Sequence, residues 1–267
     1  MCIAVFVWQA HPFYPLLLLF NRDEYYERPS KPVSWWEGRD ILGGKDEIGG
    51  GTWLACTRKG KLAFLTNVLE PSTCTVPEAR SRGDLTVRFL ESKKDPMEFA
   101  EEVLKEANQY NGFNLVLCDL CSKTMVYISN RPQGEAFVQE VSPGIHVLSN
   151  TNMDSSCHKA QRLNHTFREQ LIRYGKGEVP VELMTAELMN DTSKAEESSL
   201  PGVLSFDWEY NTSSIYVDYF DTPLGACGTR STTALSVNTD DDISVYENYL
   251  VKEEWKKHTV NFKIDRE

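Results

Sequence analysis

The chain has 267 residues, of which 41% are hydrophobic and 25% charged, and its formal net charge is -11. This composition is typical of a soluble globular protein that can bury a full core. The negative charge argues against nucleic acid as a partner. Seven scattered cysteines, an odd number, do not fit a secreted disulfide framework. We therefore expect a cytoplasmic protein with neither a signal peptide nor an integral membrane segment.

In chain order, the N-terminal third is predicted to be β-structure. Apolar and aromatic runs between turn residues predict strands at 2–8, 14–20, 52–56 and 62–67, with a glycine-bracketed loop at 43–51. Further strands are predicted at 113–119, 124–129, 135–140, 144–149, 215–220, 232–237, 243–250 and 259–264.

Helical periodicity appears between these strand predictions. It predicts helices from Pro96 to Leu104, from Ser155 to a stop at Gly175, and from Val181 to Met189. The polar segment 191–214 is predicted to be an exposed loop. Hairpin-length connections between most strands favour one α+β domain with antiparallel sheets over residues 1–267.

The first two predicted strands form a hairpin in which facing residue numbers sum to 24. Cys2 then faces Arg22 across the ladder. Both faces of both strands are apolar, which indicates that the sheet is covered on both sides. A slip of one residue would turn Arg22 to the opposite face.

Cys2 directly follows the initiator methionine, and a small side chain at that position usually leads to methionine removal. Cys2 would then carry a thiol and a free α-amine that can accept the thiol proton near neutral pH. A facing Arg22 favours the thiolate further. The alternative is a small apolar residue in a buried strand, with Asp23 or Glu24 merely pairing with Arg22.

Short motifs in a fixed order connect this opening with the rest of the chain. They are Asn21-Arg22-Asp23-Glu24, Gly50-Gly51-Thr52-Trp53-Leu54-Ala55, Leu65-Thr66-Asn67-Val68, Ser81-Arg82-Gly83, Gly112-Phe113-Asn114-Leu115, Leu148-Ser149-Asn150 and Gly228-Thr229-Arg230-Ser231-Thr232. This set, from Cys2 to about Val237, resembles the NRDE family. The resemblance implies an N-terminal-nucleophile hydrolase fold, a four-layer αββα sandwich of two antiparallel sheets.

The resemblance also implies the site residues. The expected catalytic residues are Cys2 as nucleophile, Arg22, Asp23, Asn67 and Asn150 as oxyanion donors, and Arg230. The expected substrate-binding residues are Asn21, Glu24 and Trp53. In related acylases the aspartate lies three residues after the arginine, whereas Asp23 directly follows Arg22. Either a bulge turns Asp23 toward the nucleophile, or Asp23 faces away and Asn21 or Glu24 has a role that the acylases lack.

Two functions follow from the resemblance. The first is Cys2-dependent hydrolysis of an amide or acyl-thioester such as an acyl-CoA. The second is a non-catalytic intracellular carrier of haem or lipid that uses the same pocket, with aromatic residues such as Trp53 around a small acyl or tetrapyrrole ligand. The family is linked to Golgi organisation, secretion, and lipid or haem homeostasis, which implies association with Golgi or mitochondria. No cofactor is expected, haem entering only as a ligand, and the histidines show no metal-ligand spacing.

Overall fold

The computed structural model describes residues 2–266, which divide into two compact units. The first unit contains residues 2–27 and 143–263, and the second contains residues 28–142 and 264–266. Each unit is built on one antiparallel sheet with helices, so the predicted α+β class is confirmed. The expectation of a single domain stays a prediction.

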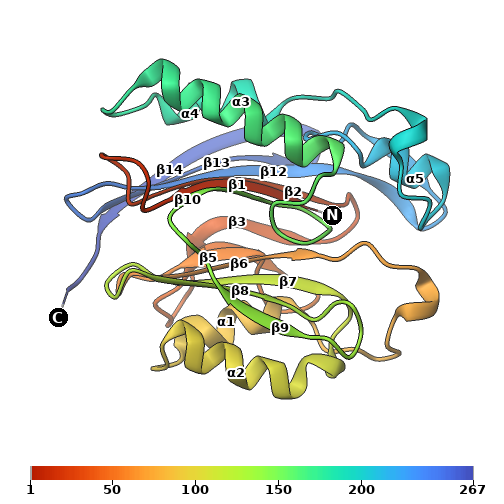
Figure 1. The fold of residues 1–267 in the computed structure, drawn as a ribbon, viewed down its shortest axis with the longest axis horizontal. Coiled ribbons are helices and arrows are strands. Elements are labelled where there is room, and N and C mark those ends of the chain that lie inside the picture. Colours follow the sequence, from red (N-terminus) through yellow and green to blue (C-terminus); the bar gives the residue numbers. More distant parts are fainter. Residues whose placement is uncertain (1, 267) are drawn as a thin grey trace. The chain divides into compact units, whose positions relative to one another are not determined.

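The sheet of the first unit has the strand order β10-β1-β2-β12-β13-β14, with β11 beside β12 (Figure 1). The strands are β1 (Cys2–Trp8), β2 (Leu16–Tyr25), β10 (Gly144–Leu148), β11 (Phe220–Thr222), β12 (Gly225–Val237), β13 (Asp242–Val251) and β14 (Glu254–Lys263). The chain's first strand therefore lies inside the sheet, between its hairpin partner β2 and β10, which comes from a distant part of the sequence.

The apolar character of β1 and β2 on both faces has a direct structural cause. Odd-numbered residues such as Ile3 and Leu19 pack into a core cluster with Leu163 and Phe167 of helix α3 (His158–Tyr174). Because side chains alternate along a strand, Cys2 and its even-numbered neighbours point to the face away from that helix.

Helices α3 (His158–Tyr174) and α4 (Val181–Met189) lie on one face of this sheet (Figure 1). Helix α3 buries Ala160, Leu163, Phe167 and Leu171 on one stripe, as the periodicity predicts. It ends at Gly175, whose φ of 75° suits glycine. A short helix, α5 (Phe206–Asn211), follows in the long segment before β11.

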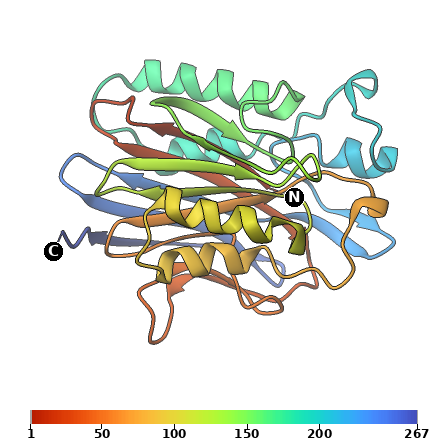
Figure 2. The same cartoon turned by 60° about the horizontal axis from the view of Figure 1, so that its bottom comes forward.

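The sheet of the second unit runs in the order β3-β4-β5-β6-β7-β8-β9. Its strands are β3 (Ser30–Trp35), β4 (Leu42–Asp46), β5 (Leu54–Cys56), β6 (Lys61–Asn67), β7 (Phe113–Asp119), β8 (Thr124–Ser129) and β9 (Phe137–Glu140). Helices α1 (Gly83–Glu91) and α2 (Pro96–Glu106) lie side by side on this unit (Figure 2). A capping box between Asp95 and Glu98 begins α2.

The three predicted helices are confirmed, while two others were missed. Helix α1 was not predicted, and the predicted loop at 191–214 contains α5 together with the buried Glu209. The predicted glycine loop at 43–51 was also partly wrong, because residues 42–46 form β4. The second strand begins at Leu16 and continues through the Asn21–Glu24 tetrad to Tyr25.

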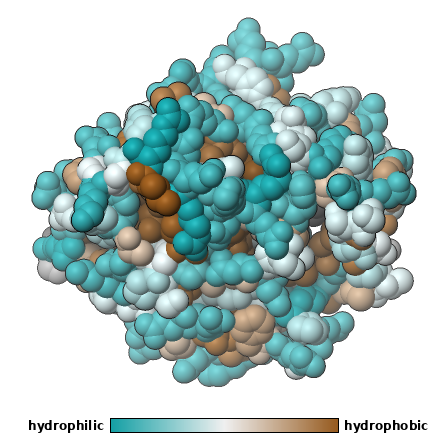
Figure 3. Space-filling model, turned by 45° about the horizontal axis from the view of Figure 1, so that its top comes forward, coloured by the Kyte–Doolittle hydropathy of each residue, from teal (hydrophilic) through white to brown (hydrophobic). Residues whose placement is uncertain are grey.

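Hydrophilic residues cover most of the face drawn in Figure 3, and hydrophobic residues appear there in small groups. No helix within residues 2–266 is both long and apolar enough to cross a membrane.

Candidate functional site

The predicted hairpin register is confirmed. Cys2 pairs with Arg22 at the end of the β1–β2 ladder, and every pair down to Trp8 and Leu16 sums to 24. Paired residues in an antiparallel ladder point to the same face. The thiol and the guanidinium therefore lie on the same face of the sheet, the one turned away from α3.

The Cys2 thiol is buried, with 7% of the residue exposed. Burial raises the pKa of this thiol, and the Asp23 charge adds to the rise, while a hydrogen bond from the Asp23 backbone and the Arg22 guanidinium lower it. Burial outweighs the other effects, so Arg22 alone does not make a thiolate at neutral pH. A nucleophilic Cys2 therefore needs a base.

Arg22 is itself buried, and its partner at the strand end is Glu24. Their side chains approach to 3.9 Å between Nη2 and Oε2, with 5% and 25% of the side chains exposed. Residues two apart on a strand share a face. Glu24 therefore partly neutralises the charge of Arg22 from the same face of the sheet, whereas Asp23 lies between them on the strand.

Asp23 lies one residue beyond the β1–β2 ladder and pairs with Thr229 of β12, where the β2–β12 register shifts before Ser231. Its Oδ1 accepts a 2.6 Å hydrogen bond from the Thr229 hydroxyl. Burial raises the pKa of Asp23, and the Lys159 ammonium and the Thr229 bond oppose this. The Thr229 bond and the Lys159 charge lie around the Asp23 side chain, and its expected part in orienting the nucleophile's amine stays a prediction.

Asn21 lies fully buried on the helix side of the sheet. Its Nδ2 donates to the carbonyl oxygens of Met189 (2.8 Å) and Ile215 (3.0 Å), and its Oδ1 accepts from the Thr232 hydroxyl at 2.6 Å. These bonds tie the end of α4 and the following segment to the sheet. Both amide hydrogens of Asn21 are thus used within the protein, and its expected role toward substrate stays a prediction.

Asn150 lies two residues after the end of β10, next to Ser149, which contacts Cys2. Its Oδ1 is 3.2 Å from the Ser149 hydroxyl and 3.3 Å from Lys159 Nζ. The Ser149 hydroxyl also reaches the Cys2 carbonyl oxygen at 3.3 Å. The structure therefore brings Cys2, Arg22, Asp23 and Asn150 together at one end of the sheet.

Arg230 occupies an irregularity in β12, where the pairing with β2 shifts between Thr229 and Ser231. Its Nη1 donates to the carbonyl oxygens of Tyr25 (2.8 Å) and Tyr26 (2.9 Å). These bonds hold the chain where β2 ends. The expected catalytic role of Arg230 stays a prediction.

Two expected site residues belong to the second unit. Asn67 ends β6, opposite Phe113 of β7. Trp53 is buried, and its ring lies so close to Gly44 that a Cβ there would come within 2.2 Å of it. Their expected roles, as oxyanion donor and substrate contact, stay predictions.

Sequence analysis missed Lys159 and Thr229. Lys159 lies one turn before Leu163 and two turns before Phe167, on the apolar stripe of α3, and is only 6% exposed. A lysine on a buried stripe is a signal that could have been used, because burying an ammonium requires partners. Thr229 belongs to the recognised Gly-Thr-Arg-Ser motif, but its bond to Asp23 depends on a pairing between distant strands.

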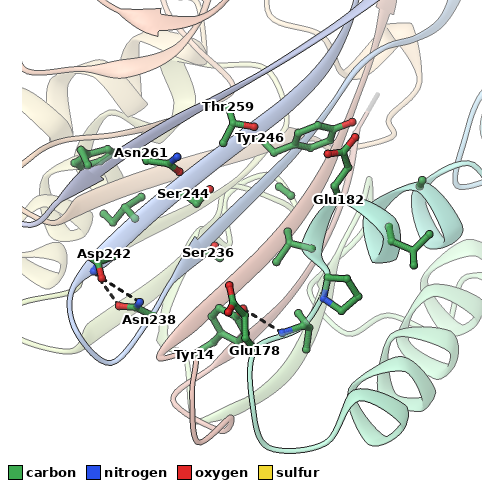
Figure 4. A pocket seen from close by; sticks show the side chains of 18 residues that line it. Tyr14, Glu178, Glu182, Ser236, Asn238, Asp242, Ser244, Tyr246, Thr259 and Asn261 are labelled. Atoms are coloured by element: carbon green, nitrogen blue, oxygen red, sulfur yellow. Dashed lines mark hydrogen bonds between the residues drawn. The ribbon is translucent and has the colours of Figure 1, made fainter.

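A separate groove of about 990 Å³ lies between α4 and strands β12, β13 and β14 (Figure 4). Hydroxyl and amide side chains such as Ser236, Ser244 and Asn261 line its floor, and Glu182 projects from α4 toward Tyr246 (Figure 4). Among residues 2–266, no cluster of three or more histidine, cysteine or acidic side chains could hold a metal ion.

Comparisons with known proteins agree with this architecture. A family model described as Transport and Golgi organisation 2 matches residues 1–252. The human Transport and Golgi organization protein 2 homolog is 32% identical over 281 residues, and its mouse counterpart 31%, each with 99% of both chains covered. The Drosophila melanogaster Transport and Golgi organization protein 2 is 27% identical over 71% of each chain.

Among solved structures, an arginine-to-leucine variant of conjugated bile acid hydrolase from Clostridium perfringens has a similar fold. The TM-score is 0.52 at 10% sequence identity, and the alignment covers 99% of this chain and 98% of the hydrolase. At this identity the similarity shows the fold alone. The fold expected from the family resemblance is thereby confirmed.

Proposed function

Because this chain belongs to the Transport and Golgi organisation 2 family and has the fold of a conjugated bile acid hydrolase, we propose that it hydrolyses an amide or acyl-thioester bond with Cys2 as the nucleophile. The observation that supports this most is the pairing of Cys2 with Arg22 at the end of a buried ladder. An acyl-CoA-like thioester is the substrate class that we favour.

In this mechanism, removal of Met1 leaves Cys2 with a free α-amine. The amine takes the thiol proton, and the sulfur attacks the substrate carbonyl carbon to form a tetrahedral oxyanion. The carbonyl then re-forms, the bond to the leaving amine or thiol breaks, and the α-ammonium returns the proton to that group. Water, deprotonated by the same amine, hydrolyses the acyl-cysteine and releases the acid.

The neighbouring residues have separate parts in this proposal. The Asn150 side-chain amide donates to the oxyanion, an interaction whose loss typically slows such reactions about 10²–10³-fold. Arg22 counteracts the effect of burial on the thiol, and its charge can also attract a substrate carboxylate or phosphate. The buried, protonated thiol makes the base indispensable, since burial alone holds the sulfur in its unreactive form.

The decisive experiment combines intact-mass analysis of the mature N-terminus with acyl-CoA turnover. We expect a mass without Met1 and a loss of turnover of more than about 10³-fold in Cys2→Ala. Cys227→Ala is the matched control, since Cys227 is also a buried strand cysteine of the first unit, and it should keep its activity. Retention of Met1, or equal turnover in Cys2→Ala and wild type, would refute the proposal.

The alternative is a carrier of haem or lipid, and the same variants separate it from the enzyme. A carrier binds its ligand equally well with Cys2→Ala, whereas it hydrolyses nothing. The groove beside α4 is lined by Tyr14 and Tyr246 but by no described histidine, cysteine or methionine, the other common ligands of haem iron. A haem titration without a saturable Soret shift would remove the haem version of this alternative.

The relatives' names place them in transport and Golgi organisation. We infer the same cellular setting for this chain, with lipid or haem homeostasis as the process and cytoplasm, near Golgi or mitochondria, as the location. Cell fractionation of the tagged protein tests this inference independently of its chemistry.

A further inference from the structure

The groove beside α4 is a second candidate site, which the proposed mechanism does not use. It lies on the helix side of the first sheet, because Ala234 on its floor also packs into the core cluster formed with α3 and α4. Alternation along the strands places Ser236, two residues further on, on the same side. The volume of about 990 Å³ lies at the upper end of the range of about 300–1,000 Å³ for small-molecule sites.

Three short polar side chains form a row across the floor of this groove. Ser236 of β12 pairs with Ser244 of β13, and Ser244 pairs with Asn261 of β14. Paired residues of antiparallel strands point to the same face, so two hydroxyls and an amide lie side by side (Figure 4). The neighbouring row contains Tyr246 and Thr259, which also pair with each other. Three adjacent strands thus present five polar groups to one groove.

The hydroxyl of Ser236 is the most deeply placed of these groups. The residue is 7% exposed, and within residues 2–266 its hydroxyl has no hydrogen-bond partner. A nearly buried hydroxyl without a partner costs free energy. Because Ser236 lines the groove, whatever occupies the groove supplies the missing bond.

The groups on the floor determine which ligand chemistry fits them. A hydroxyl or a side-chain amide both donates and accepts hydrogen bonds, whereas an ammonium only donates and an ionised carboxylate only accepts. An apolar ligand such as an acyl chain would displace water from the floor and leave these groups unpaired. The best match is a ligand whose own groups donate and accept, as the hydroxyls of a sugar do.

The charges around the groove also favour an uncharged ligand. Among the described residues that line it, Glu178, Glu182 and Asp242 are acidic and none is basic, which disfavours an anion. Two of these acids already pair with lysines of β14, Glu182 with Lys257 and Asp242 with Lys263, the latter at 3.6 Å. Little negative charge is left to attract a polycation, while the carboxylate oxygens still accept hydrogen bonds from hydroxyls.

We propose that this groove binds a small uncharged sugar, whose neighbouring hydroxyls exchange hydrogen bonds with Ser236, Ser244 and Asn261. Tyr246 borders this row and offers both an apolar ring and a hydroxyl. Burial and the Glu182 charge raise the pKa of Tyr246, so its hydroxyl stays protonated and can donate. The site lies on the face of the sheet opposite to Cys2, and the proposal does not depend on hydrolysis.

The first test is a titration of the ¹⁵N-labelled full chain with maltose, lactose and methyl α-mannoside, each added separately. We expect at least one of them to shift the backbone amide signals of Ser236, Ser244 and Asn261 saturably, with a Kd of about 0.1–10 mM. Spermidine and inorganic phosphate are the charged comparison ligands and should leave these signals unchanged. Absence of a saturable shift with all three sugars, or tighter binding of spermidine or phosphate, would overturn the proposal.

The second test locates the sugar on the floor of the groove. Ser236→Ala and Asn261→Ala should each weaken its binding about 2–10-fold, since each removes one side chain that bonds the ligand. Asn248→Ala is the matched control, because Asn248 lies on the same face of β13 but outside the groove, and its Kd should equal that of wild type. Equal weakening in all three variants, or none in Ser236→Ala and Asn261→Ala, would refute this site.

Discussion

The two units bury different kinds of polar side chain. Among residues 2–266, the buried charged residues all belong to the first unit: Arg22, Asp23, Lys159, Glu209 and Glu247. The buried polar residues of the second unit are neutral: Thr52, Thr57, Thr66, Thr86, Asn114, Ser129 and Asn130. Both units form an antiparallel sheet with helices, so the architecture alone does not require buried charge.

The two units also differ in what their buried polar groups are expected to contribute to stability. In the second unit the Tyr127 hydroxyl donates to Asn114 Oδ1 at 2.8 Å, and Asn114 Nδ2 donates to the Thr66 hydroxyl at 3.2 Å. Such a neutral chain adds order at little cost. In the first unit a guanidinium, a carboxylate and an ammonium gather around Cys2 instead, and buried charges of this kind are often less stable than apolar replacements. Under the proposed function, their clustering at one strand end serves the chemistry at Cys2.

Glu209 shows that not every buried charge belongs to the site. Its carboxylate accepts hydrogen bonds from the backbone N–H groups of Gly202, Val203 and Leu204. A carboxylate with three such donors organises a loop and needs no catalytic explanation. Arg22, Asp23 and Lys159 differ from Glu209 in lying near Cys2, which is why the proposed function concerns them and not Glu209.

The largest expected effect is the loss of stability when a fully buried phenylalanine is truncated in either unit. Phe89 of α1 and Phe167 of α3 are both 0% exposed, and we expect Phe89→Ala and Phe167→Ala each to cost about 3–5 kcal/mol in denaturant unfolding. Below the unfolding transition, only Phe167→Ala should lower acyl-CoA turnover, since Phe167 supports the helix that carries Lys159. Equal turnover losses in both variants would show that the site does not depend on the first unit's helix layer specifically.

The next effect contrasts two buried asparagines. Asn21→Leu leaves two carbonyl oxygens and the Thr232 hydroxyl without their partner, and we expect a loss of about 2–4 kcal/mol in denaturant unfolding. Asn114→Leu removes bonds to hydroxyls that can rotate toward other partners, so about 1–2 kcal/mol is expected. KM for acyl-CoA should stay unchanged in Asn21→Leu. A large rise in KM without loss of stability would instead support the substrate-binding role inferred from the family resemblance.

Sequence reasoning succeeded where a pattern had one physical solution. Two strands that are apolar on both faces, joined by a short turn, determine the Cys2–Arg22 register, because any slip would misplace every side chain. It failed at β4, whose glycines indicated a loop. A Cβ at Gly43 would come within 2.5 Å of Ala55, and one at Gly44 would meet the Trp53 ring, so the glycines serve close packing in a strand.

The candidate site was only half predictable for a similar reason. Cys2, Arg22 and Asn150 are recognisable from motifs at strand ends. Lys159 and Thr229 meet Asp23 only through tertiary contacts between α3, β2 and β12. Local sequence patterns do not determine which strands are neighbours in the sheet. The sequence can therefore show that a buried charge needs partners, but it does not identify them.

The smallest expected effect concerns ion pairs near the surface, where the two units should behave alike. Asp46 pairs with Arg28 in the second unit (2.6 Å), and Asp191 pairs with Arg162 in the first (2.5 Å). Although burial opposes it, hydrogen bonding to the arginine lowers the pKa of each carboxylate. A lowered folded-state pKa gives stability that is present above the unfolded value, about 3.9, and is lost as pH falls through the folded value.

Wild type should therefore lose stability faster than Asp46→Asn or Asp191→Asn as the pH falls from about 5 toward 2. Each difference should be below about 1 kcal/mol, because the arginines are partly exposed and solvent screens the pairs. Urea unfolding midpoints measured across this range give the slopes. Parallel pH profiles for a variant and wild type would show that its ion pair contributes nothing. A much larger difference in slope for Asp191→Asn than for Asp46→Asn would mean that the buried charges of the first unit also affect ion pairs near its surface. The two units would then differ in their electrostatics as a whole and not only around Cys2.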